Sequence, residues 1–128
     1  GGNINPESGD INVFVVRVAD NNVEIVPIVY KTVIGKLLEQ YKANQDANCE
    51  ANVRLLVQLG KVYSEFGLFE EARDCIQKAK MCNGISDDMM QRCNSVYEYI
   101  SGIDYLTKKS LQTPKEIIEH FEKSGQSD

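Results

Sequence analysis

The sequence predicts a mainly α-helical fold (α+β by content) with a β-hairpin near its N-terminus. Apolar residues between positions 53 and 82 recur every three or four residues, the period of one helix face. Residues 11–28 instead form two valine-rich segments around a polar turn, which is typical of a β-hairpin. The chain has 128 residues, 42% hydrophobic and 26% charged, so residues 1–128 are expected to form a single domain.

The N-terminal part is expected to contain a β-hairpin. Residues 1–10 are polar and predict a loose lead-in. The strands of the hairpin over 11–28 meet at Asp20-Asn21-Asn22, residue types that tolerate a positive φ. Pro27 is expected to end the second strand or to place it at a sheet edge, because proline has no backbone N–H. A lone hairpin is marginally stable, so it is expected to pack on the helices or to pair with other strands.

Residues 29–124 are predicted to be helical, and residues 125–128 form a polar tail. A first helix is expected over 29–43, because its apolar residues share one face: Tyr30, Val33, Ile34, Leu37, Leu38 and Tyr41. Asp46 is a candidate N-cap for a second helix that begins near Ala47. A last helix is predicted over 114–124 from its start signal, Thr113-Pro114-Lys115-Glu116.

The segment from Val53 to Gly84 has the most regular pattern. Apolar residues share one helix face on each side of Gly67. Before it they are Leu56, Leu59, Tyr63 and Phe66. After it they are Ala72, Ile76, Ala79 and Cys82. Two amphipathic helices joined by a glycine turn form an antiparallel helical hairpin, with the small Gly60 and Ala72 expected where the helices touch.

This helical hairpin resembles a tetratricopeptide repeat. The repeat takes a bulky residue, Leu-Gly and Tyr in its first helix, matched here by Leu56, Leu59-Gly60 and Tyr63. At the turn and in the second helix it takes Gly, an aromatic residue, Ala, a bulky residue and Ala. These are matched by Gly67, Phe69, Ala72, Ile76 and Ala79. Leu56 replaces the usual Trp. Gly84 replaces the usual closing Pro and is expected to end the helix with a left-handed cap.

A second, degenerate repeat is expected after Gly84. Ser86 is expected to cap a helix that opens with two aspartates, which suit the positive end of a helix dipole. At a period of 34 residues the key positions of its first helix are taken by Met90, Cys93, Asn94 and Tyr97. A short partner helix is expected from about Ile103 to Leu111.

The resemblance implies a binding surface. In the repeat family, the first helices of successive repeats line a concave groove that binds extended or helical peptides. The corresponding residues here are Arg54, Val57, Lys61, Ser64, Glu65, Asp88, Gln91, Ser95 and Glu98. Relatives that bind C-terminal carboxylates use a Lys-and-Asn clamp, which Val57 and Lys61 do not reproduce. The alternative is that these residues form an ordinary solvated helix face.

Composition and motifs argue against several other function classes. The net charge of −5 argues against nucleic-acid binding, and no apolar run approaches the roughly 20 residues of a membrane span. Neither phosphate-loop nor hydrolase motifs occur. The cysteines lack the close pairs of a metal site: Cys49, Cys75, Cys82 and Cys93. We therefore expect no metal, no cofactor, and a reducing, cytoplasmic location.

These observations favour a non-catalytic interaction module that binds a protein or peptide partner. A catalytic Cys/His pair would need His120, the single histidine. His120 lies four residues after Glu116 on the same predicted helix face, which is an ordinary surface pair, so a catalytic role has little support. Two alternatives stay open. The hairpin edge and the incomplete second repeat can serve as a homo-oligomer surface. The chain, which begins at Gly1, can also be a regulatory or docking piece of a larger enzyme.

Overall fold

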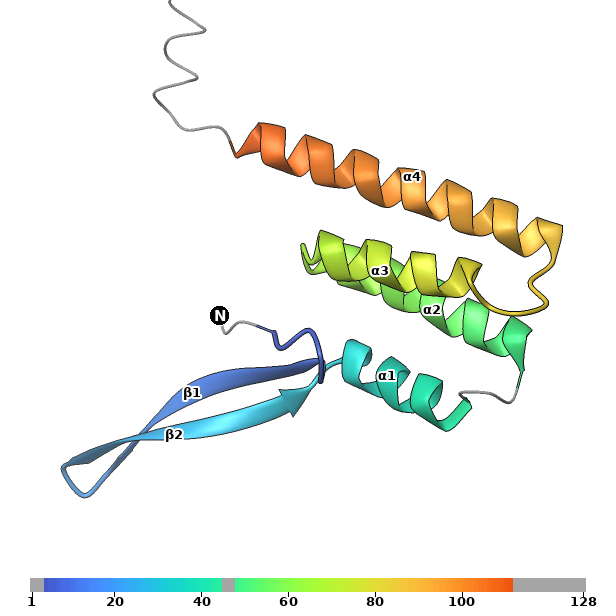
Figure 1. The fold of residues 1–128 in the computed structure, drawn as a ribbon. Coiled ribbons are helices and arrows are strands. Elements are labelled where there is room, and N and C mark those ends of the chain that lie inside the picture. The colour runs from blue at the N-terminus through green and yellow to red at the C-terminus, as the bar shows by residue number, and fades with distance from the viewer. Residues whose placement is uncertain (1–3, 45–47, 112–128) are drawn as a thin grey trace, which may run out of the picture.

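Two strands and four helices make up the described chain. The computed structural model describes residues 4–44 and 48–111. In chain order its elements are β1 (Asp10–Ala19), β2 (Asn22–Lys31), α1 (Val33–Asn44), α2 (Cys49–Glu65), α3 (Phe69–Lys80) and α4 (Asp87–Ser110). Figure 1 shows consecutive helices running in alternating directions, so that α2 and α4 point the same way. The predicted class, mainly α-helical with an N-terminal β-hairpin, is confirmed.

The hairpin is longer than predicted, and the first helix is correspondingly shorter. The prediction placed residues 29–43 in a helix, but β2 extends to Lys31 and α1 begins at Val33. Tyr30 matches the helical spacing, yet it pairs with Ile11 of β1. β-Branched and aromatic residues favour strands, and backbone pairing with β1 outweighs the helical period at these positions.

Pro27 and the hairpin turn follow the predictions made from their residue types. Pro27 lies within β2, opposite Phe14, in a two-stranded sheet whose strands are both edge strands. Asp20 and Asn21 form the turn with φ angles of 49° and 68°. Two consecutive positive φ angles match the twist of the flanking strands, which is why this turn joins them without distortion.

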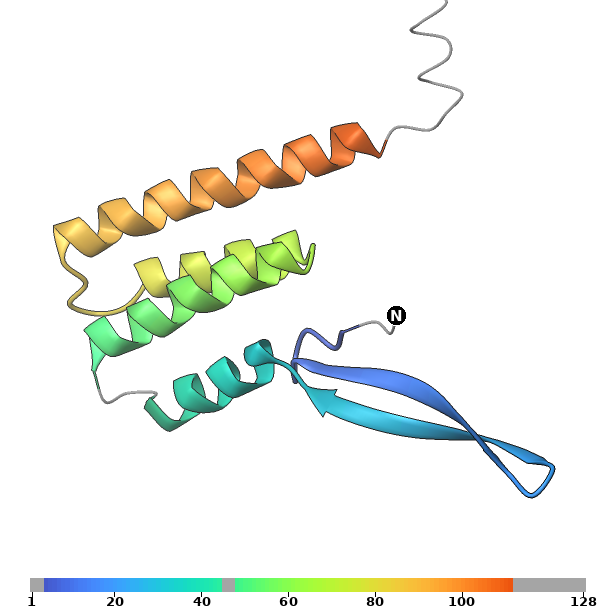
Figure 2. The same cartoon turned by 180° about the vertical axis from the view of Figure 1, so that it is seen from behind.

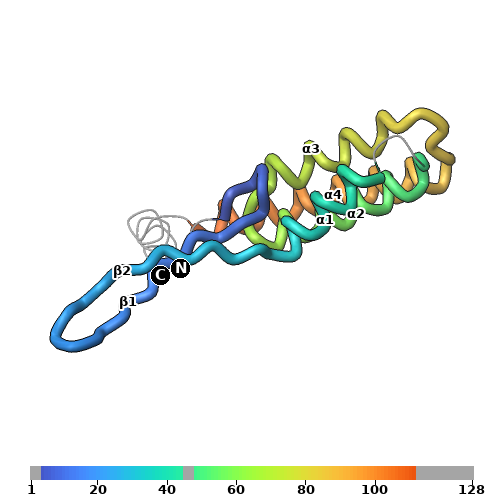
Figure 3. The backbone as a smooth tube through the Cα atoms, turned by 90° about the horizontal axis from the view of Figure 1, so that it is seen from below, coloured from blue at the N-terminus to red at the C-terminus, as the bar shows by residue number. Residues whose placement is uncertain are grey.

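The lead-in is held against the helices, so the prediction of a loose segment was wrong over residues 4–9. Gly9 is buried with a φ of 75°, and a side chain there would clash with the backbone of Gly35 in α1. The Tyr63 hydroxyl of α2 donates a hydrogen bond to the Pro6 carbonyl oxygen. These contacts fix the base of the hairpin, whose tip extends away from the helices (Figure 1 and Figure 3).

The second helix begins slightly later than predicted. α2 begins at Cys49, and Asn48 is its N-cap, with its side chain accepting a hydrogen bond from the Ala51 N–H at 3.2 Å. The predicted cap, Asp46, and the predicted start, Ala47, lie outside the described residues. Because asparagine and aspartate are comparable N-caps, residue type alone does not separate the two positions.

The core lies where α2 contacts the other three helices. Each helix contributes at least one fully buried branched side chain: Ile34 from α1, Leu59 and Val53 from α2, Ile76 from α3 and Ile100 from α4. The helices α2 and α3 form the predicted antiparallel pair, and their predicted apolar faces are buried apart from Phe66, which is exposed, and Cys82, which is half-buried. The helical body therefore depends chiefly on α2, which is also the helix that carries most of the predicted binding residues.

Gly67 and Gly84 both adopt a left-handed conformation, with φ angles of 78° and 90°, and for Gly84 this conformation was predicted. After α2, the Leu68 N–H donates to the Tyr63 carbonyl oxygen at 2.9 Å, which satisfies a carbonyl that the helix end leaves open. Gly84 was also predicted to cap the C-terminal end of α3. That prediction was wrong, because α3 already ends at Lys80 and Gly84 lies in the following loop.

The prediction of a second helical hairpin after residue 86 was also wrong. Residues 87–110 form the single helix α4, so the partner helix expected from Ile103 to Leu111 is the last part of α4. Its start is as predicted, since the Ser86 side chain accepts a hydrogen bond from the Met89 N–H at 3.2 Å. The helix predicted over 114–124 lies outside the described residues.

Packing against α3 explains why Gly102 does not interrupt α4. A helical glycine costs only about 1 kcal/mol relative to alanine. On either side of it, Ile100 is fully buried and the Asp104 carboxylate binds the Arg73 guanidinium of α3 at 2.8 Å. α4 therefore continues through Gly102, because it is held against the core both before and after this position.

The contact between α2 and α3 requires the small residue that the sequence places there. A β-carbon at Gly60 would lie 2.8 Å from Cδ1 of Ile76 and 3.2 Å from the Ala72 carbonyl oxygen. By contrast, a β-carbon at Gly102 would have no neighbour within 4 Å among the described atoms. Gly60 and Gly102 thus differ in the space around them.

We expect Gly60→Ala to lower the free energy of unfolding by about 1–3 kcal/mol, because the added methyl group must displace Ile76 in a packed core. Gly102→Ala is the matched control and is expected to raise it by up to about 1 kcal/mol, since alanine favours helices. Urea unfolding followed by circular dichroism measures both. A Gly60→Ala variant as stable as the native chain would contradict the close approach.

Candidate functional site

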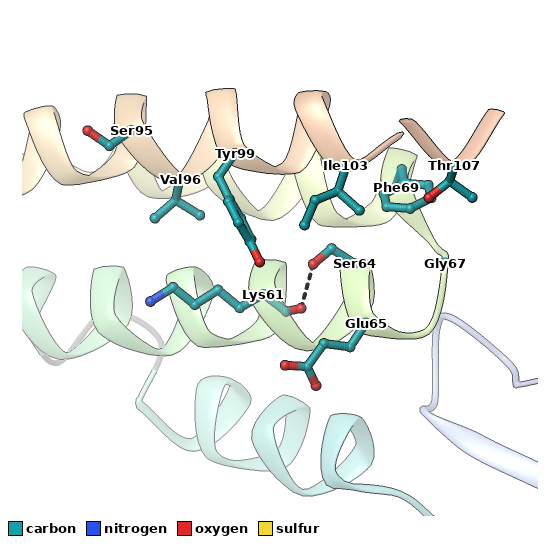
Figure 4. Close-up of a pocket in the computed structure, with 10 residues that line it drawn as sticks. All are labelled: Lys61, Ser64, Glu65, Gly67, Phe69, Ser95, Val96, Tyr99, Ile103 and Thr107. Carbon is teal, nitrogen blue, oxygen red and sulfur yellow. Dashed lines mark hydrogen bonds between the residues drawn. The ribbon is translucent and has the colours of Figure 1, made fainter. Parts of the chain in front are cut away.

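A groove lies between α2 and α4 and consists of two adjoining hollows that share Lys61. The first, of about 740 Å³, is lined by Lys61, Ser64, Glu65, Gly67, Phe69, Ser95, Val96, Tyr99, Ile103 and Thr107 (Figure 4). The second, of about 560 Å³, is lined by Glu50, Val53, Arg54, Val57, Gln58, Lys61, Asp88, Met89 and Arg92. We call the two together the α2–α4 groove.

The arrangement of the helices creates this groove. Both α2 and α4 pack against α3, and α2 and α4 run in the same direction along each other (Figure 1 and Figure 2). Residues three or four positions apart therefore face the groove along both helices, as Arg54, Val57 and Lys61 do on α2 and as Arg92 and Val96 do on α4. The groove extends along the two helices and is not confined to one end.

The first hollow is largely apolar. Val96 is buried, while Phe69 and Ile103 are half-buried. Tyr99 is 61% exposed and reaches from α4 across the groove toward α2 (Figure 4). The Ser64 hydroxyl donates a hydrogen bond to the Lys61 carbonyl oxygen at 2.6 Å, so it is already partnered within α2. Hydrophobic contact is therefore what this part of the groove offers.

The second hollow carries charges of both signs. Its rim has Glu50 and Asp88 together with Arg54 and Arg92. Glu50 and Arg54 form an ion pair of 2.6 Å between largely exposed side chains, which contributes little to stability and is free to exchange partners. The groove thus has an apolar part and a part with mixed charge, joined at Lys61.

Seven of the nine predicted binding residues line the α2–α4 groove: Arg54, Val57, Lys61, Ser64, Glu65, Asp88 and Ser95. Of these, Val57 and Ser64 are only 4% and 7% exposed and form its floor. The other two predicted residues, Gln91 and Glu98, are exposed but do not line the groove.

The rotation of α4 about its own axis explains why Gln91 and Glu98 do not line the groove. The 34-residue period transfers positions from α2 to Gln91 and Glu98, but the groove is lined one residue further on, by Arg92 and Tyr99. Burial of Cys93, Val96 and Ile100 fixes this rotation against the core. The spacing of these buried residues is present in the sequence, but the predicted helix ends before Ile103, whereas α4 continues to Ser110.

Sequence reasoning missed the part of the groove formed by the second half of α4. Ile103 and Thr107 are missing from the prediction because it assigns residues 103–111 to a separate helix, and Tyr99 is missing because the 34-residue period points to Glu98 instead. The signal that identifies them is the helical spacing that continues from Arg92 and Val96. Treating 87–110 as one helix would have placed all five on one face.

Three of the four cysteine thiols, those of Cys75, Cys82 and Cys93, have a raised pKa. Burial raises the pKa of the Cys75 thiol to about 11 and also raises the pKa of Cys93. A hydrogen bond with the Cys49 side chain, together with burial, raises the pKa of Cys82 to about 11. These thiols are protonated at neutral pH, and the thiolate is the reactive form. Within the described residues, no group of three or more potential ligands is placed to hold a metal ion.

A charged contact outside the groove fixes α4 on α3. The Arg73 guanidinium, by its hydrogen bond, holds the pKa of the Asp104 carboxyl below its usual range. The Lys108 ammonium group adds a second positive charge 3.4 Å from the other carboxylate oxygen. Since the Asp104 side chain is nearly inaccessible and both oxygens face cations, we interpret this cluster as structural.

The chain matches no family model, and comparison with curated proteins and with solved structures finds no significant match. The tetratricopeptide-like character of α2 and α3 therefore rests on the residues themselves and stays a prediction. In the part of the chain that the structure describes, no helix combines the length and apolar character required to cross a membrane.

The raised pKa of Cys75 predicts a loss of stability at alkaline pH. Its folded pKa is about 11, above the ordinary value of 9.0, so the folded state retains a proton that the unfolded state loses. The stabilisation is complete below pH 9 and lost as the pH rises through 11, by up to about 3 kcal/mol. Urea unfolding at pH 8.5 and pH 11.5 (~3 units apart) measures it. Cys75→Ala is the control and should lose less over this interval; an equal loss would contradict the assignment.

Proposed function

We propose that this chain is a non-catalytic interaction module that binds a peptide segment of a partner protein in the α2–α4 groove. The observation that carries the proposal is the groove itself, with an apolar hollow and a charged hollow side by side along two helices. Their volumes fall within the range of about 300–1,000 Å³ that is typical of binding pockets.

The apolar hollow is suited to an apolar side chain of the partner. Such a side chain can enter between Phe69, Val96 and Ile103 and contact the ring of Tyr99. Tyrosine residues often contribute a large share of binding energy, because the ring provides a rigid contact surface at low entropic cost. Tyr99 is therefore the residue to which we assign the main contribution.

The charged hollow is suited to setting the direction of the bound peptide. Arg54, Arg92 and Lys61 stand beside Glu50 and Asp88, so the groove recognises a pattern of charges and has no strong preference for one sign. Complementary charges raise specificity and association rate more than affinity. We therefore expect the bound peptide to have an apolar side chain that enters the apolar hollow, with charged residues on one side of it.

Further observations support this function over catalysis. The tetratricopeptide-like positions Gly60 and Ala72 lie at the contact between α2 and α3, which suits a repeat-like scaffold. The thiols of Cys75, Cys82 and Cys93 are protonated, as described above. All four cysteines, each of them in the described part, are free. A reducing location such as the cytoplasm suits free thiols. No observation favours the docking piece of a larger enzyme.

The test is selection of binding peptides from a displayed random library, followed by affinity measurements on two tyrosine variants. Tyr99 and Tyr105 lie on the same helix and are 61% and 64% exposed, but only Tyr99 lines the groove. We expect Tyr99→Ala to weaken binding of the selected peptides at least about tenfold, or about 1.4 kcal/mol. Tyr105→Ala should leave it unchanged.

Amide chemical shifts of the labelled chain locate the bound peptide independently. Titration with a selected peptide should shift the signals of residues on the facing sides of α2 and α4. If no peptide is selected, or if both tyrosine variants bind as the native chain does, the groove is not the binding site and the proposal fails.

A further inference from the structure

The β-hairpin presents a second, unrelated surface. Its strands pair in continuous register from Asp10 opposite Lys31 to Ala19 opposite Asn22. Alternation places seven apolar residues on one face: Phe14, Val16, Val18, Val23, Ile25, Pro27 and Val29. Six of them are 62–69% exposed, and Pro27 is also exposed. We call this the exposed face of the hairpin.

The direction of the backbone groups along β1 follows from the lead-in. The Asn5 N–H donates a hydrogen bond to the Asp10 carbonyl oxygen at 2.8 Å, so this carbonyl points away from β2. In antiparallel strands the N–H and C=O of one residue point to the same side, and the side alternates along the strand. Asn12, Phe14 and Val16 therefore direct their N–H and C=O groups outward, as does Val18.

The outer edge of β2 is interrupted, whereas the outer edge of β1 is not. Pro27 is paired with Phe14 and so lies at an outward position, where it provides no N–H. Between residues 12 and 18 the outward positions of β1 are free of proline and of charge. Natural proteins use proline and charge to protect sheet edges. Within residues 4–44 and 48–111, only Ile4 pairs with this edge, at Ile11.

We propose that the outer edge of β1 pairs antiparallel with β1 of a second copy of this chain. The dimer then contains a four-stranded sheet with the strand order β2–β1–β1–β2. Two identical antiparallel strands are related by a two-fold axis, so one edge is sufficient for both partners. Pro27 limits further growth at the outer strands, which closes the assembly at two copies.

The sequence of β1 is compatible with this pairing. With Val15 on the two-fold axis, Phe14 of each copy lies beside Val16 of the other, and Arg17 lies beside Val13. No like charges then face each other across the seam, and the seam is flanked by apolar side chains on both faces. Seven paired residues per copy give a contact at the small end of specific interfaces, below about 1,200 Å² in total, so a concentration-dependent dimer is expected.

Sedimentation equilibrium of the full chain and of two proline variants tests the proposal. Val16 and Ile25 are cross-strand partners on the exposed face, and both direct their N–H outward. A proline at either position removes one outward donor and one apolar side chain without breaking the ladder inside the hairpin. The two variants differ only in the edge that they affect.

We expect the native chain to dimerise between low micromolar and near-millimolar concentration. Val16→Pro should raise the dimer Kd at least tenfold, whereas Ile25→Pro should leave it within about threefold. A native chain that stays monomeric overturns the proposal. Equal weakening by both variants also overturns it, in favour of packing between two exposed faces. If neither variant weakens the dimer, the contact lies elsewhere and the proposal is equally wrong.

Hydrogen exchange of the native chain provides a test that does not depend on a variant that folds. At high concentration the amide protons of Phe14, Val16 and Val18 should be protected, and dilution should remove that protection. The outward amides of Val23 and Ile25 on β2 should exchange rapidly at both concentrations. Rapid exchange of all five at high concentration would contradict the edge pairing.

Opening the second edge should change the size of the assembly. Pro27→Val restores the missing outward N–H of β2, so both edges of the hairpin become available for pairing. We expect this variant to form species larger than a dimer in the same sedimentation experiment. A variant that remains strictly dimeric would contradict the role assigned to Pro27.

Discussion

The close approach of α2 to α3 at Gly60 is the constraint on which the helical body depends. With only a hydrogen atom at this position, Ile76 and Ala72 come into contact with the α2 backbone. α3 can then lie deep against α2 and still offer its other side to α4. The distance between α2 and α4, and therefore the width of the groove, follows from how closely both helices sit on α3.

The orientation of α4 depends on a second contact, between charges. Arg73 and Asp104 join α3 to α4 where both side chains are largely shielded from water, and Ile100 is buried one turn earlier. These residues assign one side of α4 to the core. Since five residues correspond to about 140° around a helix, Tyr99 is directed away from Asp104 and into the groove.

How much of the molecule could be predicted depended on the range of the interactions involved. The Ser86 cap, the hairpin turn and the α2–α3 pair depend on neighbouring residues, and the sequence predicts them. The end of β2, the continuity of α4 through Gly102 and the docking of Gly9 on Gly35 depend on residues distant in the chain. Tyr99 was missed because its place in the groove depends on how α4 is rotated against α3.

The direction of the hairpin has a consequence for valency. The hairpin extends from the α1 side of the molecule, whereas the groove is formed by α2 and α4 (Figure 2). Two copies joined through β1 would therefore keep both grooves accessible. Such a pair would bind two neighbouring segments of one partner, or two copies of it, and the second contact would form at high effective concentration. Weak individual grooves would then be sufficient for long-lived attachment.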